Sequence, residues 1–319
     1  MSQPSLLRHL ARRLIALVPT VFLMSIVVFS MTLLIPGDAA QVILGAKASA
    51  EARQDLRVKL GLDRSIPEQY LIWISKVVRG DWGYSIRTGR PVLEMVAERL
   101  PATLLLATAG TLIGLLVAMP LGVLAALKRN TAVDTGAMIL ALSAVSMPSF
   151  WLGLVLILAF ALSLGWLPST GYASLTEDPV AALKFLALPA ITLGASMVGS
   201  VARNTRSALL EELGRDYVRT ARAKGLPERT VLSPHVFRNA AVTVVTVIGL
   251  QFAYLLGGDV IVEQIFLWPG IGRLAVTAIL DRDFPLVQGV VLVAGLLLML
   301  ANLLVDVTYR FIDPRIRVD

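Results

Sequence analysis

The chain has 319 residues, of which 56% are hydrophobic and only 16% are charged. Soluble domains carry about 25% charged residues, so this composition is typical of a protein that crosses a membrane several times. The absence of cysteine excludes disulfides and thiolate metal sites, and two histidines are too few for a histidine metal cluster. The net charge of +7 comes largely from basic residues at the ends of apolar runs, as in membrane proteins, rather than from a nucleic-acid-binding patch.

Six long apolar runs divide the chain, and each is close to the roughly 20 residues that cross the hydrocarbon core of a bilayer as a helix. They are Leu14–Ile35, Ala102–Leu127, Thr135–Leu164, Leu188–Leu210, Ala240–Val262 and Leu286–Phe311. The first run is longer than the core of a signal peptide and no small-residue cleavage site follows it, so we expect an uncleaved membrane helix. Pro148 lies inside the third run and removes a backbone donor, which predicts a kink or a break there.

Lysine and arginine are concentrated in the N-terminal flank, in the turn after the second run, in the connection after the fourth run and in the C-terminal tail. An even number of spans places both termini on one side, and the positive-inside rule identifies that side as the cytoplasm. The sequence thus predicts an all-α polytopic membrane protein, with residues 1–319 forming a single transmembrane domain of six helices.

The connection between the first and second runs, residues 36–101, predicts a small helical extracytoplasmic cap. The stretch SAEARQDLRVKLG predicts a helix with Ser49 as its N-cap and Gly61 just past its end. The stretch PEQYLIWISKVVRG predicts a second helix that starts near Pro67, and PVLEMVAERLP predicts a third that leads into the second span. The cap is amphipathic and is expected at the outer interface, where Trp73 suits an aromatic belt.

The connection after the fourth run, residues 211–239, contains YVRTARAKGLPERTVLSPHVFRNA. Its order of features predicts one helix capped by Asp216 and ended by Gly225, then a second helix restarted by Pro227. The alternative is a basic loop that only fixes topology or attracts anionic lipid. Such a loop would not require a glycine to end one helix and a proline to start another. We therefore expect a helical protrusion that docks into a groove of a cytosolic partner. The residues expected to contact this partner are Asp216, Tyr217, Arg219, Thr220, Ala221, Ala223, Lys224 and Gly225.

The stretches DYVRTARAKGL and HVFRNA resemble the cytoplasmic coupling loop of ABC-transporter permease subunits, in particular those of the dipeptide, oligopeptide and nickel import family. The general motif of such importers is EAA, three residues and then Gly. Here Arg219, Thr220 and Ala221 occupy the first three places and Gly225 the last, and the peptide and nickel branch commonly replaces the glutamate in this way. The stretches GDWGYSIRTGRPVLEMVAERLPATLLLA, VIVEQIFLWPGIGRL, RDFPLVQG and NLLVDVTYRFIDPRIR resemble the same branch, so the resemblance covers most of the chain.

The resemblance implies a permease subunit of an ATP-driven ABC importer in a bacterial inner membrane, forming half of the pathway for di- or oligopeptides. Its implied partners are a second homologous permease, one or two ABC ATPase subunits, an extracytoplasmic solute-binding protein and membrane lipid, without nucleic acid. The sequence contains no G-x-x-x-x-G-K-[ST] phosphate loop, so ATP and Mg²⁺ are expected on the ATPase subunits; no cofactor is expected in this chain, which is not an enzyme. The alternatives are the same importer carrying nickel or another small solute, and an ATP-independent secondary transporter, for which no internal repeat is found in the sequence.

Other charged residues within the predicted spans suggest further sites. Asp259 is an ionisable residue in the fifth span, where it could attract a cationic group of the solute, pair with an arginine or lie among the outer headgroups. Arg203 and Arg206 lie near the cytosolic end of the fourth predicted span, where we expect their long side chains to extend into water, with a gate as the alternative. The candidate pathway residues are Asp259, Gly258, Ser149 and Trp151, the candidate residues for binding-protein docking or an outer gate are Glu263, Phe266, Pro269 and Gly270, and no metal ligands are predicted.

Overall fold

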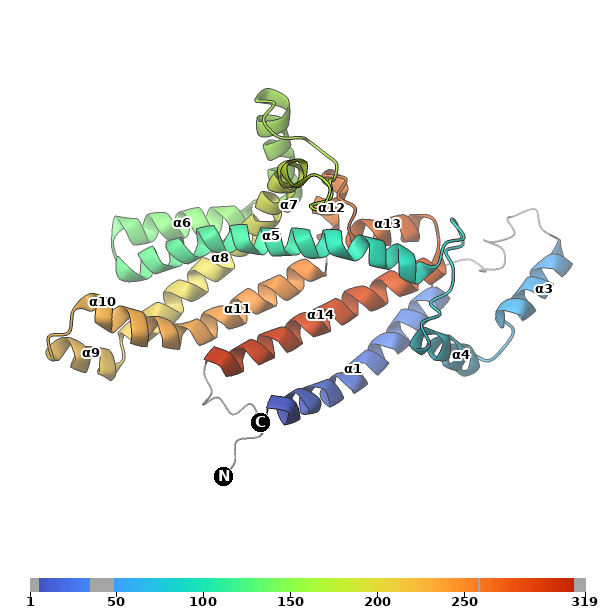
Figure 1. The fold of residues 1–319 in the computed structure, drawn as a ribbon, viewed down its shortest axis with the longest axis horizontal. Helices are drawn as coiled ribbons and strands as arrows, with labels where there is room; N and C mark the ends of the chain where they lie inside the picture. The colour runs from blue at the N-terminus through green and yellow to red at the C-terminus, as the bar shows by residue number, and fades with distance from the viewer. Residues whose placement is uncertain (1–5, 35–48, 258, 313–319) are drawn as a thin grey trace. The chain divides into compact units, whose positions relative to one another are not determined.

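The structure is a computed structural model that describes residues 6–34, 49–257 and 259–312. These residues are mostly helical, and the one β feature among them is an isolated bridge between Tyr84 and Pro91. They form two compact units, whose helices are labelled in Figure 1 and coloured by residue number. Unit 1 comprises Met1–Pro101 and Gly270–Leu296, and unit 2 comprises Ala102–Pro269 and Leu297–Asp319. Each unit is described by itself below.

Unit 1 is built from the N-terminal helix, two short helices and the helices around residue 280. Its elements are α1 (Leu6–Leu34), α3 (Ala50–Leu60), α4 (Ile66–Val78), the start of α5 (Val92–Leu127), α13 (Ile271–Leu280) and the first part of α14 (Phe284–Ile312). The predicted ends of α3 are confirmed, because the Ser49 hydroxyl accepts a hydrogen bond from the Ala52 N–H and Gly61 adopts a left-handed conformation with φ of 71°. The predicted third helix of the cap leads into the second apolar run as expected, because α5 continues through Pro101 to Leu127.

The loop between α4 and α5 is held in place by one buried carboxylate. Asp283, at the start of α14, accepts hydrogen bonds from the Ser85 hydroxyl and from the Ile86 N–H at 3.1 Å. A carboxylate that receives several donors satisfies backbone groups that a loop would otherwise leave to water. The region predicted as an ordered cap is therefore fixed through contacts within unit 1.

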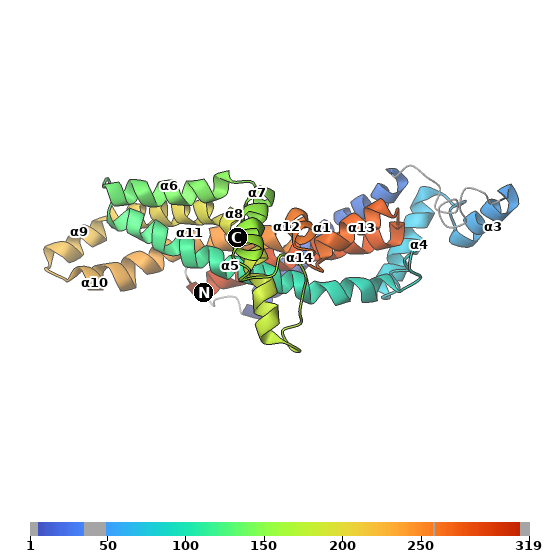
Figure 2. The ribbon, with the colours of Figure 1, turned by 90° about the horizontal axis from the view of Figure 1, so that it is seen from above.

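Unit 2 contains the remaining helices. They are α6 (Ala132–Ser146), α7 (Ser149–Leu156), the π-helix η1 (Ile157–Ser163), α8 (Pro179–Leu213), α9 (Asp216–Ala223), α10 (Glu228–Val231), the π-helix η2 (Leu232–Phe237), α11 (Arg238–Leu256) and α12 (Val260–Ile265). The helix α8 is the central element, packed against α6, α7 and α11. In both views the turn between α5 and α6 lies at the same end of this unit as α9 and α10 (Figures 1 and 2).

The contact between α5 and α8 is a close backbone approach through glycine. A Cβ atom added to Gly194 of α8 would lie 2.6 Å from the carbonyl oxygen of Gly110, and one added to Gly122 of α5 would lie 2.6 Å from the carbonyl oxygen of Ala202. Small residues of this kind permit the tight packing that holds membrane helices together, since lipid offers no hydrophobic driving force for helix association. We call this contact the glycine seam.

Four of the described helices are long and apolar enough to cross a membrane, namely α5, α8, α11 and α14. A fifth span results if α6 and the α7–η1 segment count as one, although these two parts meet at 97° (Figure 2). The predicted interruption at Pro148 is confirmed, because α6 ends at Ser146 and α7 begins at Ser149. In α1 the described apolar part is the shorter segment Ile15–Met31, and the end of the first predicted span at Ile35 lies outside the described residues.

Candidate functional site

The protrusion predicted after the fourth span is formed by α9, α10 and η2, which connect α8 to α11 (Figure 1). We call these three helices the coupling block. The helix α9 starts one residue earlier than predicted: Arg215 holds the N-cap position, with no hydrogen bond from its side chain, and Asp216 is the first helical residue. The prediction that Asp216 is the N-cap is therefore wrong. Its carboxylate still lies in the first turn, where it favours the helix dipole, and it is 3.5 Å from the Arg219 guanidinium.

The end of α9 matches the predicted stop at Gly225. This glycine has φ of 74°, the Gly225 N–H donates to the Arg222 carbonyl at 2.9 Å, and the Leu226 N–H donates to the Ala221 carbonyl at 3.3 Å. The pair of bonds is a Schellman motif, which places a residue in the left-handed region directly after the helix. Apart from the neighbouring residues in the chain, no atom of the described residues lies within 4 Å of the position a Cβ would take at Gly225, so the preference for glycine there comes from the backbone angle.

The one fully buried side chain of α9 is that of Val218, which packs into the rest of unit 2. Val218 is 0% exposed. It belongs to an apolar cluster formed by Ala126, Ala208, Leu209, Val218, Val231, Val236, Ala240 and Val244. These residues come from α5, α8, α10, η2 and α11, so α9 is fixed against the ends of three long helices. The sequence prediction missed Val218, although it is the single branched aliphatic residue in an otherwise polar helix.

Two polar contacts complete the coupling block. The Tyr217 hydroxyl donates to a carboxylate oxygen of Glu212 at 2.7 Å and accepts from the Asn239 amide at 3.3 Å, which connects α9 to the ends of α8 and α11. Burial, and then the bond to Glu212, raise the pKa of Tyr217, so the hydroxyl remains a donor at neutral pH. The Arg222 guanidinium binds Glu228 with its Nε 2.7 Å from the carboxylate, across the turn between α9 and α10.

The structure places most of the predicted contact residues on the exposed side of α9. Seven of the predicted contact residues are exposed, namely Asp216, Tyr217, Arg219, Thr220, Ala223, Lys224 and Gly225. The exception is Ala221, which is partly buried against the apolar cluster. The exposed surface combines small residues with arginine and lysine at its rim, and its backbone is fixed from behind by Val218. Such a surface is suited to docking against another protein rather than to covalent chemistry.

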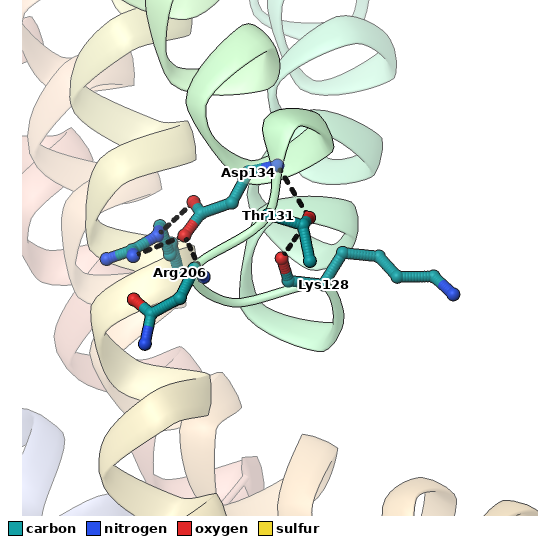
Figure 3. A network of polar contacts seen from close by, with 5 residues as sticks. Lys128, Thr131, Asp134 and Arg206 are labelled. Atoms are coloured by element: carbon teal, nitrogen blue, oxygen red, sulfur yellow. Dashed lines mark hydrogen bonds and ion pairs between the residues drawn. The ribbon is translucent and has the colours of Figure 1, made fainter.

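Beside the coupling block, an ion pair connects the start of α6 to α8 (Figure 3). The Arg206 guanidinium donates from Nε to Asp134 Oδ1 at 2.7 Å and from Nη2 to Asp134 Oδ2 at 2.8 Å. The carboxylate also accepts from the Asn130 N–H at 3.0 Å, and the Asp134 residue is 5% exposed. The prediction that Arg206 extends into water is therefore wrong, because Arg206 binds back onto α6; Arg203 is exposed. Asp134 was missed because its partner lies 72 residues away along the chain.

The candidate pathway residues that the structure describes lie at the starts of α12 and α7, two helices that pack against each other. Asp259 is the N-cap of α12 and accepts hydrogen bonds from the Ile261 and Val262 N–H groups at 3.1 and 3.2 Å. Its carboxylate thus has a local structural partner, as expected for aspartate at a helix start. Trp151 is exposed and Ser149 is partly buried at the start of α7. Gly258 lies outside the described residues.

The candidate docking and gate residues around α12 differ in exposure. Glu263 and Phe266 are buried, at 1% and 2% exposed, and the Thr103 hydroxyl donates to Glu263 at 3.3 Å. Their side chains therefore face the interior and do not form an outer surface. Pro269 is partly exposed, and Gly270 is the residue before α13. Among the described residues no group of three or more histidine, cysteine, aspartate or glutamate side chains could hold a metal ion.

Comparison with known proteins identifies the family. Residues 118–318 match the family described as binding-protein-dependent transport system inner membrane component, and residues 6–107 match the N-terminal region of such membrane components. A protein of Brucella abortus (strain 2308) named as a peptide transport system permease is 45% identical over 308 residues, covering 97% of this chain and 98% of that protein. The glutathione transport system permease protein GsiC of Escherichia coli (strain K12) is 41% identical over 312 residues, covering 98% of this chain and 99% of that protein.

The fold has a solved counterpart. The inward-facing structure of the MetNI methionine ABC transporter superimposes with a TM-score of 0.58 at 17% identity, covering 69% of this chain and 97% of that chain. The chain therefore belongs to the family of binding-protein-dependent transport system inner membrane components and is a multi-pass permease subunit of an ABC transporter in the inner membrane.

Proposed function

We propose that the chain forms half of the translocation pathway of an ATP-driven importer for peptides, which a solute-binding protein delivers at the outer face. The support for the substrate class is that relatives with 41–45% identity over nearly the whole chain are named as permeases for peptides and for glutathione, itself a small peptide. An importer of the same type for nickel or another small solute is the alternative. In this proposal a second, homologous permease forms the other half of the pathway.

The observation that carries the proposal is the coupling block. The fully buried Val218 packs α9 against the rest of unit 2, and the opposite side of α9 is exposed. The block directly follows the 35-residue helix α8 in the chain. We infer that an ABC ATPase subunit binds this block in a groove. Closure of the ATPase pair on ATP then displaces the block as a rigid body, and α8 carries the displacement towards the outer side of the pathway. ATP and Mg²⁺ are bound by the ATPase subunits in this mechanism.

The proposed membrane topology puts the coupling block in the cytoplasm, together with both termini, and counts α1 as the sixth span. With 29 residues, α1 is about 43 Å long, which exceeds the roughly 30 Å of a hydrocarbon core. The topology is supported by charge, because Lys128 and Arg129 lie in the turn at the same end of unit 2 as the cations of α9 (Figures 1 and 2). Positive residues in short connections remain on the cytoplasmic side.

The test of coupling is a bulky substitution on the exposed side of α9. We expect Ala223→Trp to abolish co-purification with the ATPase subunits and to abolish uptake, because the added ring would hold the ATPase away from the helix. Ala132→Trp is the matched control, since Ala132 is also an exposed alanine at this end of unit 2 but lies outside the coupling block. If Ala223→Trp retained both ATPase binding and uptake, the proposed docking would be wrong.

The substrate class requires a separate measurement. Uptake of a labelled dipeptide, of glutathione and of Ni²⁺ should be compared in the same cells, with and without the chain. Peptide uptake that depends on the chain supports the proposal, whereas uptake of Ni²⁺ alone would assign the importer to the alternative.

A further inference from the structure

The short helix α4 was expected to lie in an extracytoplasmic cap, but its contacts place it beside the apolar part of α1. The Tyr70 ring lies 6.3 Å from the Phe22 ring and 5.6 Å from the Phe29 ring, measured between centroids, and the Trp73 ring lies 5.8 Å from the Phe29 ring. The Tyr70 hydroxyl also shares a hydrogen bond of 2.8 Å with the Ser25 hydroxyl. One face of α4 is therefore fixed to α1 by an aromatic cluster and a polar contact.

These contacts define how deep α4 lies relative to the membrane. All three α1 residues fall within the apolar segment Ile15–Met31, and Phe22 is nine residues before the end of that segment. At a rise of roughly 1.5 Å per residue, Phe22 lies about 14 Å from Met31 along the helix axis. A helix that touches Phe22 and Phe29 lies alongside this segment rather than beyond its end. If α1 spans the membrane as proposed above, α4 is at the depth of the hydrocarbon.

Within the part of the chain that the structure describes, a second apolar face of α4 is left largely exposed, with Ile74 partly buried. Pro67, Leu71, Ile74 and Val78 recur at spacings of four, three and four residues, which places them along one side of the helix. Leu71 is 62% exposed and Val78 is 81% exposed. Exposure of such a stripe to water carries a free-energy cost of about 25 cal/mol per Å² of apolar surface. Contact with the hydrocarbon of a bilayer removes this cost.

The remaining side of α4 is more polar. Glu68, Ser75 and Lys76 lie between the two apolar faces, with Ile72 among them, and Arg79 follows the last turn. Lysine and arginine next to an apolar stripe can extend to the phosphate headgroups while the stripe stays in the acyl chains. The helix thus has one side for α1, one for lipid and one for the headgroup region.

We propose that α4 is an intramembrane amphipathic helix whose Leu71–Val78 face contacts the acyl chains of the outer leaflet. This proposal rests on the topology given under the proposed function. Lipid is favoured over a solute-binding protein or a second permease because the stripe consists of aliphatic residues and proline, without the aromatic or arginine anchors that dominate protein interfaces. The adjoining α1 surface is also apolar and open, with Phe22 itself 54% exposed.

The absence of cysteine from the chain allows a direct test. Single cysteines at Leu71 and Val78, and at Glu68 as the matched control on the polar side, would each carry a nitroxide label in the intact transporter in liposomes. Both aliphatic positions are exposed, so the substitutions create no cavity. We expect the ratio of accessibility to oxygen over accessibility to a water-soluble nickel chelate to be about tenfold higher at Leu71 and Val78 than at Glu68, as for an interfacial helix.

Equally low ratios at all three positions would show that α4 lies in water, equally high ratios would show that it has no polar side, and the proposal would fail in either case. Protection of Leu71 and Val78 from both reagents would show that protein covers the stripe, and the proposal would fail in that case too. Neither result bears on ATPase binding, which the Ala223→Trp variant tests separately. A failure here would therefore be distinguishable from a failure of the proposed transport function.

Discussion

Val218 gives the sharpest test of how the coupling block is held. Val218→Ala removes two methyl-sized groups from a side chain that is 0% exposed, in an eight-residue helix whose other side chains are not buried. Burial contributes about 0.8 kcal/mol per methylene, and a residual cavity adds to the loss. We therefore expect the docking of α9 to weaken by roughly 1.5–2.5 kcal/mol.

The effect should be local, because α9 is bounded by turns at both ends and its long neighbours keep their own packing. A loss of this size corresponds to a roughly 10- to 70-fold increase in the population of the opened state, since about 1.4 kcal/mol is a factor of ten. Amide hydrogen exchange measured by mass spectrometry on the purified permease, with a peptide covering residues 216–226, reports that opening directly.

The control for this experiment is Arg219→Ala, because the Arg219 side chain is 81% exposed and contributes nothing to the buried cluster. Its exchange should match the wild type. The amount of solute moved per ATP should also fall in Val218→Ala, because a loose block transmits less of the ATPase motion. Exchange in Val218→Ala within threefold of the wild type would refute the reasoning, since it would mean that Val218 does not hold α9.

Four further substitutions test the end of α9 and the ion pair between Asp134 and Arg206. Gly225→Ala should fold, because among the described residues only the chain neighbours come near the added Cβ. The left-handed backbone should nevertheless cost about 1–2 kcal/mol and speed amide exchange at the end of α9, whereas Gly225→Asn should have a smaller effect. Equal exchange rates in the two variants would contradict this. Asp134→Asn should lower the thermal stability of the assembled transporter, and Arg206→Lys should lower it too despite keeping the charge, because lysine cannot form the two parallel bonds to Asp134. A wild-type melting temperature for Arg206→Lys would show that charge alone is sufficient.

Several helix ends and one helix interruption could be predicted from the sequence. Gly225 and Pro227 bound α9 and α10 as predicted, Pro148 interrupts the third span, and Ser49 caps α3. Each of these depends on a residue and its immediate neighbours, so no tertiary information is needed. The same holds in retrospect for Asp259, whose position just before a short apolar helix is that of an N-cap.

Features that depend on packing between distant segments could not be predicted from the sequence. Asp134 and Arg206 meet because α6 and α8 lie side by side, and neither residue carries a local sign of its partner. The burial of Glu263 follows from the orientation of α12, which the helical pattern does not define. Likewise, α4 is amphipathic in sequence, but its depth depends on which part of α1 it touches.

The glycine seam has a consequence for how strain spreads through the permease. Two helices can slide along each other only if side chains ride over one another, and beside the backbone contact at Gly194 the side chains of Leu193 and Met197 lie directly against Gly110 and Gly114 of α5. A push on α8 is therefore shared by α5 without slippage, so neither helix can absorb it alone. We therefore expect deformation of unit 2 to concentrate where the helical hydrogen bonding is already interrupted, as at Met147 and Pro148 between α6 and α7.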